Sequence, residues 1–267
     1  TTHIVNTASN AMVAIMQVYE RMAAAGVSSL RGAAPGQGVA SGEAAAMLYG
    51  LKAGLWDSFR MAGKALRTGE SAMGQQLGKI DLPVGRFNRG ATRAIGSQAF
   101  GLDEAGAVGR TVDFLGAAVN VPGRLLVTGD EFFKSIGYRM ELHAQAYRQA
   151  SSEGLQGQAL GEQIGRILAD PPEHIRMAAA DAALYNTFTN QAGWFGQSLM
   201  KLRSAGGSAN PIVFIMPFVR TPMNIARFAF ERSPVAPLVG QWRADIAAGG
   251  ARADLARRAD GEAGRRG

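Results

Sequence analysis

Cysteine is absent from this chain of 267 residues, and histidine occurs only three times. Without cysteine there can be no disulfide framework, no thiolate zinc site and no thiol nucleophile. His3, His143 and His174 are too scattered along the sequence to give a metal-binding signature. We therefore expect no metal site.

The chain also lacks the short motifs that mark common enzyme sites. It contains neither a G-x-S-x-G elbow nor an H-E-x-x-H pair. The glycine-rich stretch 27–42 misses the dinucleotide spacing, and no Gly-Lys-Ser/Thr follows it, so it predicts no nucleotide site. Asp130 and Glu131 are adjacent and would point apart on a helix, so we expect them to cap a helix N-terminus. We predict a protein that is not an enzyme and needs no cofactor.

Charged residues make up only 18% of the chain, and the balance is positive. The formal net charge is +7 and the isoelectric point is about 10.1. Such a surplus favours nucleic acid, an anionic membrane face or an acidic protein as a partner, although frequent arginine alone also raises the isoelectric point. No window reaches the roughly 18 to 20 uncharged apolar residues that a membrane-spanning helix needs.

Apolar residues recur at helical spacing, beginning with residues 7–25. One face of this stretch carries Met12, Ile15, Met16, Tyr19 and Met22, and Gly26 is expected to end the helix. We interpret the methionine-rich stripe as adaptable core or interface packing rather than as a metal site.

The clearest helical pattern begins at Ser41 and runs to about Leu66. Gly50 and Gly54 are four residues apart, which is typical of close helix packing. Near-heptad spacing predicts a long seam against another helix, with Trp56 widening it. The seam residues would be Leu48, Leu51, Leu55, Phe59, Ala62 and Leu66.

Further helices are predicted downstream, separated by glycine and proline breaks such as Pro122–Gly123 and Pro171–Pro172. Their ranges are 103–121, 129–150, 155–168, 173–203 and a last helix from about 241. Period-two alternation is limited to short patches, so we predict an all-α fold, an elongated assembly of many helices joined by Gly/Pro bends without significant β-sheet. The expected divisions are an N-terminal helical segment (1–80), a basic turn-rich linker (81–102), a main helical region (103–240), and a C-terminal helix with a charged tail (241–267).

Two stretches supply candidate contact residues for assembly, DNA or membrane. Residues 210–240 are apolar and basic and contain five prolines, which leave room for a short phenylalanine-rich helix between Pro222 and Pro234. The linker places arginines around Phe87, a combination that can grip a phosphate backbone or form a solvated corner. The candidates are Arg86, Arg89 and Arg93 in the linker, Phe218, Phe228 and Phe230 as packing anchors, and Arg220 and Arg227 as contacts to a carboxylate, phosphate or helix end.

Three stretches carry a resemblance to a known family. They are residues 120–150 with the Gly-Asp-Glu-Phe-Phe-Lys core at 129–134, residues 174–193, and residues 217–238 with the Pro-Phe-x-Arg-Thr-Pro-x-Asn core at 217–224. Together they resemble the C-terminal region of the very large internal virion proteins of tailed bacteriophages, the large polyvalent protein group. The resemblance covers roughly residues 120–240 and brings no catalytic residues. Because the chain opens at Thr1 and closes on a tail-like stretch, we expect a segment of a longer polypeptide.

The resemblance implies a protein packaged in the capsid near the portal, in the virion interior, which leaves with the genome for the host periplasm or cell envelope. There it would help to form a conduit for genome delivery. Its implied partners are further copies of itself, portal or other internal virion proteins, phage double-stranded DNA bound without sequence preference, and the host inner membrane. Two alternatives stay open: a membrane-active protein inserting residues 211–238, and a segment of a peptidoglycan-cleaving enzyme.

Overall fold

The computed structural model describes residues 2–68, 101, 103, 106–187, 226, 228–233, 236–238 and 240–257. Within these ranges the backbone forms helices joined by turns and contains no strand. The predicted all-α class is therefore confirmed for the part of the chain that the structure describes.

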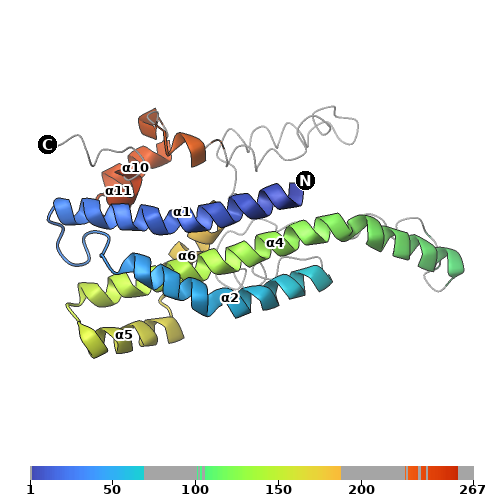
Figure 1. Cartoon of the computed structure of the whole chain (residues 1–267), viewed down its shortest axis with the longest axis horizontal. Helices are drawn as coiled ribbons and strands as arrows, with labels where there is room; N and C mark the ends of the chain where they lie inside the picture. The colour runs from blue at the N-terminus through green and yellow to red at the C-terminus, as the bar shows by residue number, and fades with distance from the viewer. Residues whose placement is uncertain are drawn as a thin grey trace.

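The fold is organised around one long helix, α4, which spans Ala107–Ser152. Helix α2 (Glu43–Thr68) packs along α4, and α1 (Thr2–Leu30) lies against both (Figure 1). After α4 the chain turns into α5 (Gly157–Ala169) and α6 (Glu173–Asn186), which pack against another side of α4. The C-terminal elements are η3 (Ala236–Leu238), α10 (Gly240–Ala248) and α11 (Gly250–Arg257), and α11 returns to α1.

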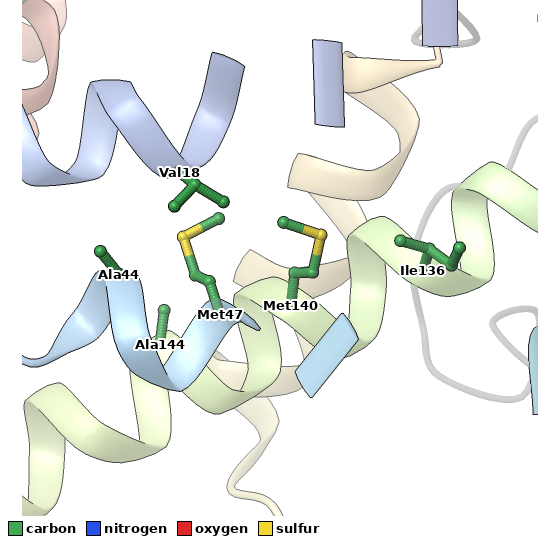
Figure 2. Close-up of a cluster of buried hydrophobic side chains, with 6 residues drawn as sticks. All are labelled: Val18, Ala44, Met47, Ile136, Met140 and Ala144. Atoms are coloured by element: carbon green, nitrogen blue, oxygen red, sulfur yellow. The ribbon is translucent and has the colours of Figure 1, made fainter. Parts of the chain in front are cut away.

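Two hydrophobic clusters hold α4 on opposite sides. One lies between α1, α2 and α4, where the thioethers of Met47 and Met140 meet below Val18 (Figure 2). The other joins α4 to α5 and α6, through Ala146, Ile167 and their neighbours. On α4 each cluster uses residues four apart, so each occupies its own stripe of the helix. A helix buried on two stripes can serve as the axis of a small bundle.

Helix α4 runs through the predicted bend at Pro122–Gly123, so the prediction of two separate helices, 103–121 and 129–150, is wrong. A proline inside a helix removes one hydrogen bond and kinks the axis without having to end the helix. Figure 1 shows α4 changing direction in its N-terminal part and extending beyond the end of α2. The predicted capping role of Asp130 and Glu131 is also wrong, because the helix begins at Ala107 and Glu131 is fully buried in its interior.

The first helix is longer than the sequence predicted. It continues through Gly26 and ends at Leu30, followed by Gly32 in the left-handed region (φ 66°). The Gly32 N–H donates to the Ser29 carbonyl, and the Ala33 N–H donates to the Ser28 carbonyl, each over 3.0 Å. This pattern is a Schellman motif, which requires a positive φ at one position. Gly32 therefore ends α1, while Gly26 is tolerated within it.

The predicted seam of α2 is confirmed as a helix contact, but only some of its predicted residues are right: Leu51 and Leu55 pack against the core and Ala62 is buried. The side facing α4 is lined by Met47, Gly50, Gly54 and Ser58, with Leu51 and Leu55 at its border. Four other apolar residues of α2 are exposed outside this side: Leu48, Trp56, Phe59 and Leu66. The glycine pair forms the close contact it predicted, since a methyl group on Gly50 would lie 2.6 Å from the Arg139 carbonyl oxygen.

Two helices near the C-terminal end of the sequence differ from their predicted ranges. The helix predicted over 173–203 begins at Glu173 as α6 but ends at Asn186, so it is shorter than predicted; residues 188–203 lie outside the described residues. The single C-terminal helix predicted from about 241 is wrong, because Gly249 adopts a φ of 70° and divides it into α10 and α11. A left-handed residue cannot continue a right-handed helix.

Candidate functional site

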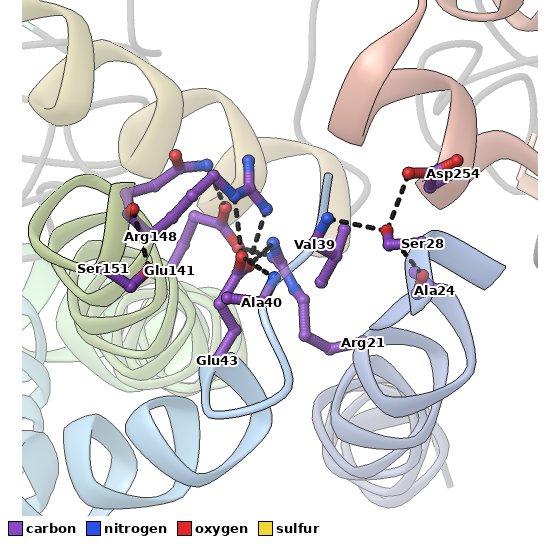
Figure 3. Close-up of polar contacts among 11 residues, drawn as sticks. Arg21, Ala24, Ser28, Val39, Ala40, Glu43, Glu141, Arg148, Ser151 and Asp254 are labelled. Carbon is purple, nitrogen blue, oxygen red and sulfur yellow. Dashed lines mark hydrogen bonds and ion pairs between the residues drawn. The ribbon is translucent and has the colours of Figure 1, made fainter. Parts of the chain in front are cut away.

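The most elaborate polar site is a buried junction of α1, α2 and α4. Glu43, at the start of α2, is fully buried and accepts hydrogen bonds from two guanidinium groups (Figure 3). Arg148 of α4 donates to it over 2.8 Å from Nε and 2.6 Å from Nη2, and Arg21 of α1 donates over 3.1 Å. The Ala40 N–H completes the set at 2.7 Å. The carboxylate thereby joins three elements.

A second carboxylate balances the charge of this junction. Arg21 also pairs with Glu141 of α4, whose other oxygen accepts a hydrogen bond of 2.6 Å from the Gln145 amide. Two arginines and two glutamates thus form one compensated network with little solvent contact. Buried charges need such compensation, because leaving one unpaired costs several kcal/mol. Each carboxylate is held by cations and donors, an arrangement that serves to fix helices.

A third buried acid fastens helix α11. Asp254 of α11 is fully buried and accepts a hydrogen bond of 2.7 Å from the Ser28 hydroxyl (Figure 3). It accepts another of 2.7 Å from Arg31. The same hydroxyl accepts the Val39 N–H over 2.8 Å. The end of α1, the following loop and α11 therefore meet at one hydroxyl.

Phe228, a predicted packing anchor, lies at another junction. Arg232 places its guanidinium carbon 3.5 Å from the centre of the Phe228 ring and forms two hydrogen bonds with Glu20 of α1, at 2.6 and 3.0 Å. The Tyr185 ring of α6 packs at a tilt beside the same ring, with ring centres 5.8 Å apart. Its hydroxyl accepts a hydrogen bond from Arg232 and donates one to Glu231. Burial raises the pKa of Tyr185 to about 12. Phe228 thus packs within the chain against Tyr185 of α6 and Arg232, and Arg232 in turn binds Glu20 of α1.

The other predicted contact residues are not brought together by this site. Phe230 is 54% exposed, so within one chain it is not enclosed by neighbours. The remaining candidates lie outside the described residues, namely Arg86, Arg89, Arg93, Phe218, Arg220 and Arg227.

Helix α1 presents an exposed apolar stripe on the side away from the bundle. Met12, Ile15, Tyr19 and Met22 are each between 57% and 67% exposed. Their spacing of three, four and three residues is the a/d spacing of a coiled coil. Between residues 4 and 30 the sequence has only two charged residues, Glu20 and Arg21, and both turn inward to the junctions described above. The stripe is therefore free of formal charge.

The sequence predicted the stripe but not the buried junctions. Arg21 and Glu43 stand out only as single charges beside apolar helix faces, which is a weak signal. Their distant partners lie far away in the chain: Arg148 is 105 residues from Glu43, and Glu141 is 120 residues from Arg21.

His143 belongs to the packing of α2 against α4. It is buried, its ring lies near Tyr49, and its Nδ1 is 2.8 Å from the Arg139 carbonyl, to which only a protonated Nδ1 can donate. Burial lowers the pKa of His143 below its usual 6.5. Within the described ranges, no three histidine or acidic side chains gather closely enough to hold a metal ion. No helix among the described residues is both long and apolar enough to cross a membrane.

Comparison with known proteins adds no relative to this picture: no family model, no curated protein and no solved structure matches the chain.

Proposed function

We propose that this chain is a structural assembly protein without enzymatic activity, whose copies associate through the exposed stripe of α1. The observation that carries the proposal is the uncharged a/d pattern of Met12, Ile15, Tyr19 and Met22, exposed on a helix whose two charged residues face inward. An apolar a/d stripe is the surface that a second helix covers in a coiled coil. Large exposed apolar patches commonly mark protein interaction sites.

A second copy of the same chain suits the stripe because two uncharged faces meet without electrostatic repulsion. Its methionine side chains can adapt to an imperfectly matched partner. From Met12 to Met22 the stripe is about 15 Å long at 1.5 Å per residue. A seam of that length supports association of moderate strength, which further contacts would reinforce.

Together with the family resemblance, this surface supports a more specific proposal. The protein is an internal virion protein of a tailed bacteriophage, packaged near the portal, which oligomerises to help form a conduit for genome delivery across the host envelope. Its partners are other copies, portal or other internal virion proteins, and phage double-stranded DNA, for which the net charge of +7 provides non-specific attraction.

Sedimentation velocity of the purified chain tests the assembly proposal. We expect concentration-dependent oligomers for the natural sequence and a shift toward monomer for the double variant Tyr19→Lys/Met22→Lys, because the new charges would be buried in the seam. Leu238→Lys is the matched control, since Leu238 is 79% exposed and lies far from α1 in sequence. A natural chain that stays monomeric at high concentration, or a double variant that assembles normally, contradicts the proposal.

The virion role has its own test. In particles imaged by electron microscopy, density for the chain should repeat around the portal axis. Particles that infect normally without this protein would contradict the role in genome delivery while leaving self-association intact.

A further inference from the structure

The exposed side of α2, which borders the contact with α4 at Tyr49 and Phe59, is an unusual surface. Large apolar and aromatic side chains along it are between 41% and 73% exposed, although their type would suit a core. They are Leu48, Tyr49, Trp56, Phe59 and Leu66. At one border Phe59 touches Phe132 of α4, with ring centres 4.9 Å apart, and Phe133 packs edge-on against Phe132. The apolar surface therefore continues from α2 onto α4.

Cations accompany these side chains, whereas both acidic residues of α2 are paired elsewhere. Lys52, Arg60 and Arg67 are exposed and follow the apolar residues at helical spacing. Helix α2 has only two acidic residues: Glu43 is buried in the polar junction, and Asp57 pairs with Arg139 over 2.7 Å. We name this surface the outer face of α2, defined by Leu48, Tyr49, Lys52, Trp56, Phe59, Arg60, Leu66 and Arg67.

We propose that the outer face of α2 binds the surface of an anionic lipid bilayer, with the helix lying in the plane of the headgroups. Helices that lie in this plane combine leucine, phenylalanine and tryptophan on one side with lysine and arginine beside them. Tryptophan and tyrosine suit the boundary between headgroups and acyl chains, because their rings are apolar with one polar atom. The long stems of Lys52 and Arg60 can bury their methylenes while their charges reach lipid phosphates.

The charges on the outer face of α2 favour an anionic membrane over a second copy of the chain or double-stranded DNA. A second copy docking on the same face would bring like charges together, which the uncharged stripe of α1 avoids. Double-stranded DNA would satisfy the cations but would leave Leu48, Phe59 and Leu66 in water. An anionic membrane satisfies both sets of side chains at once. From Leu48 to Arg67 the face extends over about 28 Å at 1.5 Å per residue, so several lipid headgroups can contact it.

Co-sedimentation of the full chain with lipid vesicles tests the proposal. One set of vesicles is phosphatidylcholine alone, and the other is phosphatidylcholine and phosphatidylglycerol in equal parts. We expect binding to the anionic vesicles only. Because each cation near an anionic surface contributes about 1 kcal/mol, Lys52→Gln/Arg60→Gln should weaken binding about thirtyfold. Trp56→Gln/Leu48→Gln should weaken it about tenfold or more, through lost apolar burial.

Matched controls separate lipid binding from misfolding and from self-association. All four substituted side chains are exposed, so circular dichroism should show unchanged helix content. The double variant Tyr19→Gln/Met22→Gln alters the α1 stripe instead and should bind anionic vesicles as the natural chain does. A natural chain that stays monomeric but binds anionic vesicles would contradict the proposed function and leave this inference standing.

Three outcomes would overturn the inference. The first is an absence of binding to anionic vesicles, and the second is equal binding by the natural chain and both outer-face variants. The third is a lipid-inert chain that binds a short double-stranded DNA and loses that binding in the Lys52→Gln/Arg60→Gln variant. That last result would identify the outer face of α2 as a nucleic-acid surface.

Discussion

A single methyl group at Gly50 should disturb the close contact between α2 and α4. A Cβ atom there would lie 2.6 Å from the Arg139 carbonyl oxygen and 2.8 Å from Nδ1 of His143. Those two atoms already form a hydrogen bond with each other, so the methyl group would press on both of its ends. The Arg139 carbonyl belongs to the backbone of α4, so it cannot rotate away from the methyl group as a long side chain can. Gly50→Ala therefore requires α2 and α4 to separate.

The expected size follows from two opposing effects. Alanine in place of glycine inside a helix stabilises it by about 1 kcal/mol. Overpacking a tight contact costs about 1 to 3 kcal/mol, and here the separation also loosens the cluster around Met47 and Met140. We expect Gly50→Ala to lower the free energy of unfolding by about 1 to 2 kcal/mol in total.

Gly63 provides the matched control in the same helix. A methyl group there meets no described atom within 4 Å, so Gly63→Ala should raise the free energy of unfolding by about 0.5 to 1 kcal/mol. Gly54→Ala should fall between the two, because its nearest neighbour is the Arg139 side chain at 2.8 Å. Urea unfolding followed by circular dichroism measures all three. Should Gly50→Ala prove as stable as Gly63→Ala, the close contact between α2 and α4 would be refuted.

Two further predictions concern buried ionisable groups. Glu43→Gln should lower the free energy of unfolding by about 3 to 5 kcal/mol, because Arg21 and Arg148 keep their charges without a full counter-charge. The control Glu162→Gln, on the exposed side of α5, should change the free energy of unfolding little. The urea midpoints of the two variants measure the difference. Burial lowers the pKa of His143 in the folded chain, so below its ordinary value of 6.5 the unfolded chain binds the extra proton. Stability should fall as the pH drops through that window, and His143→Gln should flatten the change; an unaltered pH profile for the variant would contradict it.

The sequence alone determined the fold class and the position of most helices. Apolar residues at a period near 3.6 require a helix that can bury one face, and this signal is local. The sequence also predicted the close helix contact at Gly50 and Gly54, because small residues four apart let two helices approach closely. The α1 stripe is also a local signal, which the sequence predicts to be core or interface packing.

The tertiary structure decided what local signals leave open. Either Gly26 or Gly32 could end α1, and only Gly32 stands where the following loop completes the Schellman hydrogen bonds. Pro122 looked like a break because proline removes a hydrogen bond, yet the chain continues as helix on both sides. In each case the sequence predicts that the glycine or proline weakens the helix, but the surrounding structure decides whether the helix ends there.

The orientation of α2 and the pairing of charges were beyond the sequence for the same reason. Leu48 and Leu51 are both good seam residues, and only the close approach at Gly50 turns Leu51 toward α4 and Leu48 outward. Arg148 finds Glu43 across 105 positions, a contact that exists only once α2 lies along α4. Helix formation depends on neighbours in the chain, whereas the choice of face and of ion partner depends on neighbours in space.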